Sequence, residues 1–193
     1  MTDKGIILDL CGGTGAWSRP YVDAGYDVRM VTLPEQDVRL YQPPENVHGI
    51  LAAPPCTMFS LARRTAKLPL DSAGAMEIVH ACLSIIWASR IAGSLRWWCL
   101  ENPVGLLRQF LGKPFLTFQP CNYGDSQTKR TDLWGYFTAP RKRPILVKKP
   151  KGRVEGGTRD WSFAKTGRAN LTRQQVRAIT PPGFAQAFFK ANP

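Results

Sequence analysis

Hydrophobic runs in the first part of the chain alternate with breaks that glycine and proline mark. Residues 5–10, GIILDL, form a short apolar run that stops at a glycine cluster, as a buried parallel strand does. Residues 16–24 favour a helix that ends at Gly25, and residues 26–33 favour a second strand. This order of strand, turn, helix and strand predicts a βαβ opening.

The alternation continues along the chain. Apolar positions three and four residues apart across 71–95 predict a long helix, with Asp71 or Ser72 as its N-cap. The other expected elements are strands at 48–55 and 96–103, a short helix at 104–111, a strand pair at 116–124 and 132–137 near the sheet edge, and a final helix at 172–190 broken by Pro181 and Pro182. The order predicts a Rossmann-like α/β fold, with a mostly parallel central sheet and helices on both faces.

Residues 138–170 differ in composition from the rest. They are rich in proline and glycine, and their ten Lys and Arg against Glu155 and Asp160 carry eight of the chain's twelve net positive charges. Trp161 and Phe163 lie among these cations, a mixture typical of nucleic-acid surfaces, although a solvated linker is the alternative. We therefore expect a main domain at 1–137, a basic insert at 138–170 and a C-terminal helix at 171–193 that returns to the main domain.

Composition narrows the class of protein. A chain of 193 residues, 44% of them hydrophobic, is long enough for one domain with a real core. Its five cysteines contain no C-x-x-C pair, which argues against a disulfide framework or a zinc site and favours a reducing cytosol. The N-terminus lacks the apolar region of a signal peptide. Charged or polar residues interrupt the apolar stretch at 78–100, so no membrane span is expected; these are His80, Arg90 and Arg96.

The glycine cluster in DLCGGTGAW, residues 9–17, lies where a strand passes into a helix. Small residues there let a ligand approach the backbone closely, although glycine can also serve helix–strand packing. The spacing is neither that of G-x-G-x-x-G nor that of a P-loop. A nucleoside cofactor without a bridging diphosphate, such as S-adenosylmethionine, fits the turn better.

Two further segments follow predicted strands. AAPPCTMFS, residues 52–60, places Cys56 in a stiff loop, and Glu101 in LENP ends an apolar strand. Each alone has an ordinary interpretation, a buried small thiol or a capping carboxylate. The carboxyl ends of parallel strands meet at one edge, however, so the glycine turn, Cys56 and Glu101 should face one crevice. A thiol nucleophile, a carboxylic acid and a cofactor turn in one crevice indicate an enzyme.

These segments together resemble the cytosine-5 DNA methyltransferases. DLCGGTGAW resembles the family's cofactor turn D-L-F-x-G-x-G-G-F, AAPPCTMFS its nucleophile loop G-G-P-P-C-Q-x-F-S, and LENP its Glu-Asn-Val. NYGDSQTKRTDLW resembles N-Y-G-x-P-Q-x-R-x-R, and ANLTRQQVRAITPPGFAQAF resembles a fusion of L-T-P-R-E with the last helix and its Val-Pro-Pro. The segments keep the family's order. The resemblance implies a methyltransferase fold that uses S-adenosylmethionine and acts on a cytosine turned out of duplex DNA.

The resemblance also assigns roles. Cys56 matches the thiolate that adds to C6 of cytosine, and Glu101 the acid that bonds N3. Lys129, with Arg130 adjacent, stands where the family has an arginine near the pyrimidine carbonyl. The implied cofactor contacts are Asp9, Cys11, Gly13, Thr14, Gly15, Trp17, Thr32, Leu33, Asp37, Val38 and Pro55. Asp37 is the candidate acceptor for adenine or ribose, a turn aspartate being the alternative. The expected DNA contacts are Ser60, Arg63, Arg64, Lys67, Arg141, Lys142, Arg143, Lys148, Lys149, Lys151 and Trp161.

The chain departs from the family pattern at several points. Thr57 replaces Gln, Pro103 replaces Val, Thr32 stands where an acid is expected, and Thr131 replaces the second arginine. Residues 138–170 are far fewer than the family's target-recognition domain contains. We therefore expect phosphate contacts to dominate, with low or short sequence specificity. By analogy with compact enzymes of bacteria and phages, a cytoplasmic monomer is expected.

Two other functions fit parts of the pattern. One is a catalytically silent nucleic-acid-binding protein on the same fold, and the other is an enzyme that modifies a free pyrimidine nucleotide. The basic insert argues against the free nucleotide, because a small substrate needs no such surface. The intact Pro-Pro-Cys and Glu-Asn argue against the silent fold.

Overall fold

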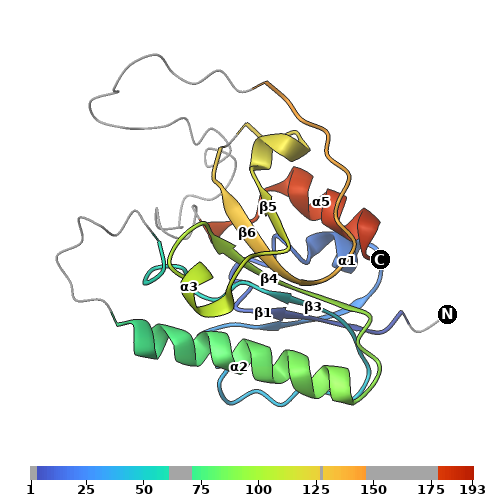
Figure 1. Ribbon diagram of the computed structural model, residues 1–193. Coiled ribbons are helices and arrows are strands. Elements are labelled where there is room, and N and C mark those ends of the chain that lie inside the picture. The colour runs from blue at the N-terminus through green and yellow to red at the C-terminus, as the bar shows by residue number, and fades with distance from the viewer. Residues whose placement is uncertain (1–3, 61–70, 127, 147–177) are drawn as a thin grey trace.

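The computed structural model describes residues 4–60, 71–126, 128–146 and 178–193 (Figure 1). Within these ranges six strands form one sheet in the order β2-β1-β3-β4-β6-β5. The strands are β1 (Ile6–Leu10), β2 (Asp27–Val31), β3 (Val47–Ala52), β4 (Trp97–Pro103), β5 (Leu116–Phe118) and β6 (Thr131–Tyr136). The first four strands are parallel, and β6 runs antiparallel to both of its neighbours.

Helices cover both faces of this sheet. They are α1 (Arg19–Asp23), α2 (Ser72–Ile91), α3 (Arg108–Leu111), the 3₁₀ helix η2 (Pro120–Tyr123) and α5 (Pro182–Ala191). In Figure 1, α2 lies along one face and α1 and α5 lie on the other. The predicted Rossmann-like α/β fold is therefore confirmed. Because the chain passes from β1 to β2 on one side and returns to β3 on the other, the topological switch point lies between β1 and β3.

Several element boundaries differ from the sequence prediction. The strand expected at 116–124 ends at Phe118, because Pro120 starts the 3₁₀ turn η2. The helix expected at 104–111 is shortened to α3. Pro182 is the first residue of α5, a position where the missing N–H of proline costs nothing. The proline pair therefore starts this helix, whereas the sequence analysis predicted a break inside it. The earlier part of the predicted helix at 172–190, up to residue 177, lies outside the described residues.

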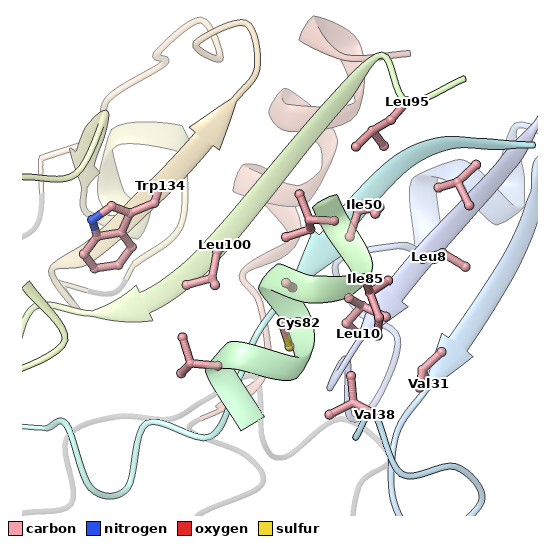
Figure 2. Close-up of a cluster of buried hydrophobic side chains, with 14 of the residues drawn as sticks. Leu8, Leu10, Val31, Val38, Ile50, Cys82, Ile85, Leu95, Leu100 and Trp134 are labelled. Carbon is pink, nitrogen blue, oxygen red and sulfur yellow. The ribbon is translucent and has the colours of Figure 1, made fainter. Parts of the chain in front are cut away.

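The core on the α2 face is aliphatic. Asp71 caps α2, its carboxylate accepting a hydrogen bond from the Gly74 N–H at 2.9 Å. One side of α2 then packs on the sheet through its buried residues Val79, Cys82, Ile85 and Ile86. Figure 2 shows these contacts, with Leu8 and Leu10 of β1, Ile50 of β3 and Leu100 of β4 meeting the helix. By length and composition alone α2 is the one described helix that could cross a membrane. One side of α2 packs on the sheet, and 28% of its apolar stretch is buried.

The core on the opposite face is aromatic. The Trp17 ring contacts Phe184 and Phe188 of α5 at 6.0 and 5.5 Å between centroids. The Tyr21 hydroxyl of α1 donates to the Asn192 carbonyl at 2.7 Å, so the end of the chain is held against α1. The C-terminal helix thus completes the layer that lies beneath the glycine turn.

Candidate active site at the carboxyl edge of the sheet

Three candidate segments leave the sheet at the same level. Leu10 of β1 is in register with Ala52 of β3, which is in register with Leu100 of β4. The Ala53 N–H donates to the Leu10 carbonyl at 2.9 Å and continues the pairing past the strands. The glycine turn, the Pro-Pro-Cys loop and the Glu-Asn pair therefore lie side by side, in the arrangement expected from parallel strands.

The glycine turn, Cys11–Ser18, lies over a buried carboxyl group. Ser18 Oγ donates to Asp9 Oδ2 at 2.5 Å, whereas Asp9 Oδ1 is buried without a hydrogen-bond partner among the described residues. Burial raises the pKa of Asp9 to about 6, although the Ser18 bond opposes this shift. Gly13 has a φ of +59°, and a side chain there would meet no atom within 4 Å. The turn is thus open above and polar beneath.

The other residues expected to contact a cofactor occupy different environments. Thr14, Leu33 and Pro55 are exposed at the edge, and Cys11, Gly15 and Thr32 are half-buried. Trp17 is only 2% exposed and lies in the aromatic core, so its ring supports the turn from beneath. Val38 packs in the aliphatic core on the α2 face.

Asp37 is already engaged by a neighbour in sequence. Its carboxylate accepts from the Arg39 N–H at 2.9 Å and from the Arg39 guanidinium at 2.5–3.1 Å. These bonds lower the pKa of Asp37 to about 2. Asp37 thus has the contacts of a turn aspartate, and a nucleoside hydroxyl would share the carboxylate with Arg39; its role toward a cofactor stays a prediction.

Cys56 begins a tight turn. Its carbonyl accepts from the N–H groups of Phe59 at 3.1 Å and Ser60 at 2.9 Å, while its own side chain is half-buried. Thr57, which stands where the family pattern has Gln, is exposed. The thiol is therefore held at the start of one closed turn, next to the rigid Pro54-Pro55 pair.

The segment after Glu101 ties this loop down at both ends. Asn102 is fully buried, and its Nδ2 donates to the Pro54 carbonyl at 2.9 Å. The Leu106 N–H donates to the Phe59 carbonyl at 2.8 Å. Gly105 permits this approach, because a Cβ there would lie 2.1 Å from the Phe59 carbonyl oxygen. The Pro-Pro-Cys loop and the Glu-Asn segment thus form one connected unit.

Glu101 faces a small pocket on the α5 side of the sheet. Burial raises the pKa of the Glu101 carboxyl, the positive charge of Lys129 opposes the shift, and Asp132 adds to it. Among the described residues the pocket is lined by Glu101, Phe118, Pro120, Lys129, Thr131, Ala178, Ile179, Thr180, Pro181 and Phe184. Of the four residues expected at the pyrimidine, Glu101 and Lys129 therefore line one pocket, whereas Cys56 and Arg130 are not in its lining. Arg130 is exposed, and its carbonyl accepts from the Val104 N–H at 3.1 Å.

The sequence analysis missed the walls of this pocket. The Phe118 and Phe184 rings stack at 4.0 Å with an interplanar angle of 15°. Residues 178–181, which lead into α5, form another wall. The ITPPGF segment was available as a signal, since it resembles the family's last motif, but its spatial position requires the tertiary structure.

Part of the expected DNA surface is described. Arg141, Lys142 and Arg143 are exposed, and this segment runs beside η2, with the Arg143 N–H bonded to the Asn122 carbonyl at 2.8 Å. Ser60 is half-buried in the Cys56 turn. The remaining expected contacts lie outside the described residues; these are Arg63, Arg64, Lys67, Lys148, Lys149, Lys151 and Trp161. In the part of the chain that the structure covers, no group of three or more His, Cys, Asp or Glu side chains could hold a metal ion.

Comparison with known proteins adds little to this picture. No family model matches the chain, and no curated protein matches it. Among solved structures, a mutant of DNMT2 from Spodoptera frugiperda is similar with a TM-score of 0.41 and 17% sequence identity. The match covers 76% of this chain and 55% of that chain. At this TM-score and sequence identity the match supports no inference about the function of this chain.

Proposed function

We propose that this protein is an S-adenosylmethionine-dependent DNA cytosine-5 methyltransferase. The observation that carries the proposal is the connection between the Cys56 loop and the β4 end that bears Glu101, through Asn102 and Pro54. A thiol and a carboxyl group with a raised pKa are thereby fixed beside an open glycine turn. The motif resemblance supports the same assignment.

The glycine turn fits the proposed cofactor. Gly13 leaves the space above the backbone open, and Asp9 Oδ1 is a buried acceptor without a partner among the described residues. Gly13, Thr14 and Gly15 would hold the cofactor by backbone contact, at the carboxyl edge where α/β proteins bind nucleosides. S-adenosylmethionine supplies an electrophilic methyl group at such a site.

The chemistry of cytosine explains the two reactive side chains. In the proposed reaction the Cys56 sulfur adds to C6, and Glu101 donates a hydrogen bond or proton to N3 as negative charge develops on the ring. C5 then has enamine character and takes the methyl group, after which C5 loses its proton and the C6–S bond breaks. The raised pKa of Glu101 keeps a proton available for N3. The Lys129 ammonium, in the same pocket, stabilises negative charge on the pyrimidine carbonyl.

The proposed substrate is a cytosine extruded from duplex DNA. Cys56 cannot reach C6 inside a base stack, so the base has to leave the helix. Arg141, Lys142 and Arg143 are exposed and offer phosphate contacts, which give affinity without sequence information. Bisulfite sequencing of methylated plasmid should therefore show many modified cytosines in short or varied contexts, and one long unique site would contradict this proposal.

Methyl transfer can be measured directly. Purified protein is incubated with S-adenosylmethionine and duplex DNA, and the digested DNA is analysed for 5-methylcytosine by mass spectrometry. Wild type should produce it, whereas Cys56→Ser should not and Cys121→Ser, which changes a thiol of similar exposure, should remain active. A parallel reaction with free deoxycytidine monophosphate tests the nucleotide-modifying alternative. DNA binding without 5-methylcytosine on any duplex or single strand would favour a silent binding protein.

A further inference from the structure

Asp125, a half-buried acid, joins η2 to the start of α5. The two elements pack against each other, and Figure 1 shows α5 beside the turn that follows β5. The Gly183 N–H, in the first turn of α5, donates to Asp125 Oδ1 at 3.4 Å. The Asp125 N–H in turn donates to the Pro120 carbonyl at 3.3 Å and closes the η2 turn. Asp125 is therefore bonded to both elements.

The contact between η2 and α5 is a close one. A Cβ at Gly183 would lie 2.2 Å from the Tyr123 carbonyl oxygen and 2.7 Å from Asp125 Oδ2. The Tyr123 ring also meets the Phe184 ring edge-on, at 5.3 Å between centroids. Any side chain larger than that of glycine at position 183 would therefore push the start of α5 away from η2.

The two elements that Asp125 joins are also two walls of the Glu101 pocket. Pro120 of η2 lines the pocket on one side, and Pro181, next to the start of α5, lines it on another. Lys129, four positions after Asp125, belongs to the same lining. Asp125 is not among the described residues of the lining, so it acts on the pocket through the position of the walls.

We propose that Asp125 is a positioning residue that fixes the separation of η2 and α5 and thereby the shape of the Glu101 pocket. A displaced wall admits water to the Glu101 carboxyl group and lets it ionise more readily. It also misplaces the groups around the base, and small errors in placement slow a reaction strongly. The effect on methyl transfer rests on the proposed function, whereas the effect on the pocket does not.

Four variants separate position from charge. Asp125→Ala removes the acceptor, and Gly183→Ala keeps the acceptor but places a methyl group against the Tyr123 carbonyl. Asp125→Asn removes the negative charge, while its side-chain oxygen can still accept from the Gly183 N–H. Asp71→Ala is the matched control, because Asp71 caps α2 through the Gly74 N–H at 2.9 Å and is not among the described residues that line the pocket.

The shape of the pocket is tested by the titration of Glu101. It is followed by NMR in protein labelled with ¹³C-glutamate, and the signal is assigned by its loss in Glu101→Gln. The midpoint should fall toward that of an exposed glutamate in Asp125→Ala and Gly183→Ala, and stay at the wild-type value in Asp125→Asn and Asp71→Ala. An unchanged midpoint in the first two variants, or an equal fall in Asp71→Ala, would overturn the proposal. If Asp125→Ala does not fold, the midpoint in Gly183→Ala decides.

The consequence for catalysis is tested by single-turnover methyl transfer. The rate constant should fall about tenfold to 100-fold in Asp125→Ala and Gly183→Ala, and stay close to wild type in the other two variants. DNA affinity should not change, because the exposed basic segment is bonded to η2 through the Asn122 and Cys121 carbonyls. An unchanged rate despite a lower midpoint would refute the role in catalysis. If the midpoint falls but wild type transfers no methyl group, the proposed function fails and the effect of Asp125 on the pocket stands.

Discussion

Two acidic residues on neighbouring strands, Glu101 and Asp132, have contrasting surroundings: Glu101 is half-buried and Asp132 is buried. Asp132 on β6 is completely buried and accepts two bonds of 2.6 Å from the Arg108 guanidinium and a third of 2.6 Å from the Thr117 hydroxyl. Glu101 on β4 is half-buried and faces the other side of the sheet, where Lys129 is the cation among the described residues that line its pocket.

The different surroundings of the two carboxyl groups suit them to different roles, Asp132 to holding the fold together and Glu101 to catalysis. Three charge-assisted bonds hold the Asp132 carboxylate, so this carboxylate ties β6 to α3 and β5. Burial raises the pKa of Glu101, and the charge of Lys129 opposes the shift. A half-buried acid with a raised pKa that lines a pocket is the better candidate for catalysis, and the following changes test that contrast.

Glu101→Gln should have the largest effect on activity. The amide is nearly isosteric but cannot supply a proton to N3, so we expect single-turnover methyl transfer to fall roughly 100- to 10,000-fold. The free energy of unfolding, measured with urea, should stay level or rise, because the substitution removes a carboxyl group whose ionisation its surroundings disfavour. A large loss of stability with little change in rate would reverse the roles assigned to the two acids.

Arg108→Ala should have the largest effect on stability. It leaves the Asp132 carboxylate buried with Thr117 alone, at a cost of about 3–5 kcal/mol in unfolding free energy. Arg39→Ala is the matched control, since the Arg39–Asp37 pair is also bidentate but partly exposed, and its loss should cost at most about 1 kcal/mol. Equal losses in the two variants would show that burial of Asp132 is not what matters.

Asp9→Asn tests the buried acid beneath the glycine turn by its pH dependence. The pKa of Asp9 is about 6 in the folded protein against 3.8 unfolded, so folding favours the protonated form. Wild type therefore loses stability as pH rises from about 4 through 6. The amide does not titrate, and the variant should gain about 3 kcal/mol relative to wild type between pH 4 and pH 8. Glu45→Gln, an exposed acid, is the control, and a pH-independent difference would contradict the buried state of Asp9.

Asn102→Ala should have the smallest effect of the four. The Pro54 carbonyl loses its partner, which costs about 1–3 kcal/mol if water does not replace it. The Cys56 loop should loosen, so the rate of methyl transfer should fall without loss of DNA affinity. Asn46→Ala, at an exposed asparagine, provides the comparison. A variant with wild-type rate would show that this hydrogen bond does not position the thiol.

The strands, the glycine turn and the positions of Cys56 and Glu101 at the carboxyl edge were predictable because their signals are local. An apolar run followed by Pro-Pro-Cys or Glu-Asn marks the carboxyl end of a strand, and parallel strands place such ends together. The long helix was predictable from its periodicity and from Asp71 as its cap.

The remainder depends on contacts between residues distant in sequence. The Arg108–Asp132 pair and the stacking of Phe118 on Phe184 join elements that no local pattern connects. Nor does periodicity indicate that β6 enters the sheet between β4 and β5. Asp37 is a different case, because its partner Arg39 is two residues away and its turn role could have been favoured from sequence.

The most direct test of the central claim is covalent capture of the substrate. The protein is incubated with S-adenosylmethionine and duplex DNA containing 5-fluorocytosine, whose fluorine blocks loss of the C5 substituent, and the products are resolved on a denaturing gel and mapped by mass spectrometry. We predict a DNA adduct at the Cys56 sulfur, abolished in Cys56→Ser and strongly reduced in Glu101→Gln. Protein that binds both S-adenosylmethionine and this DNA, yet forms no adduct or forms one at another cysteine, would contradict the assignment.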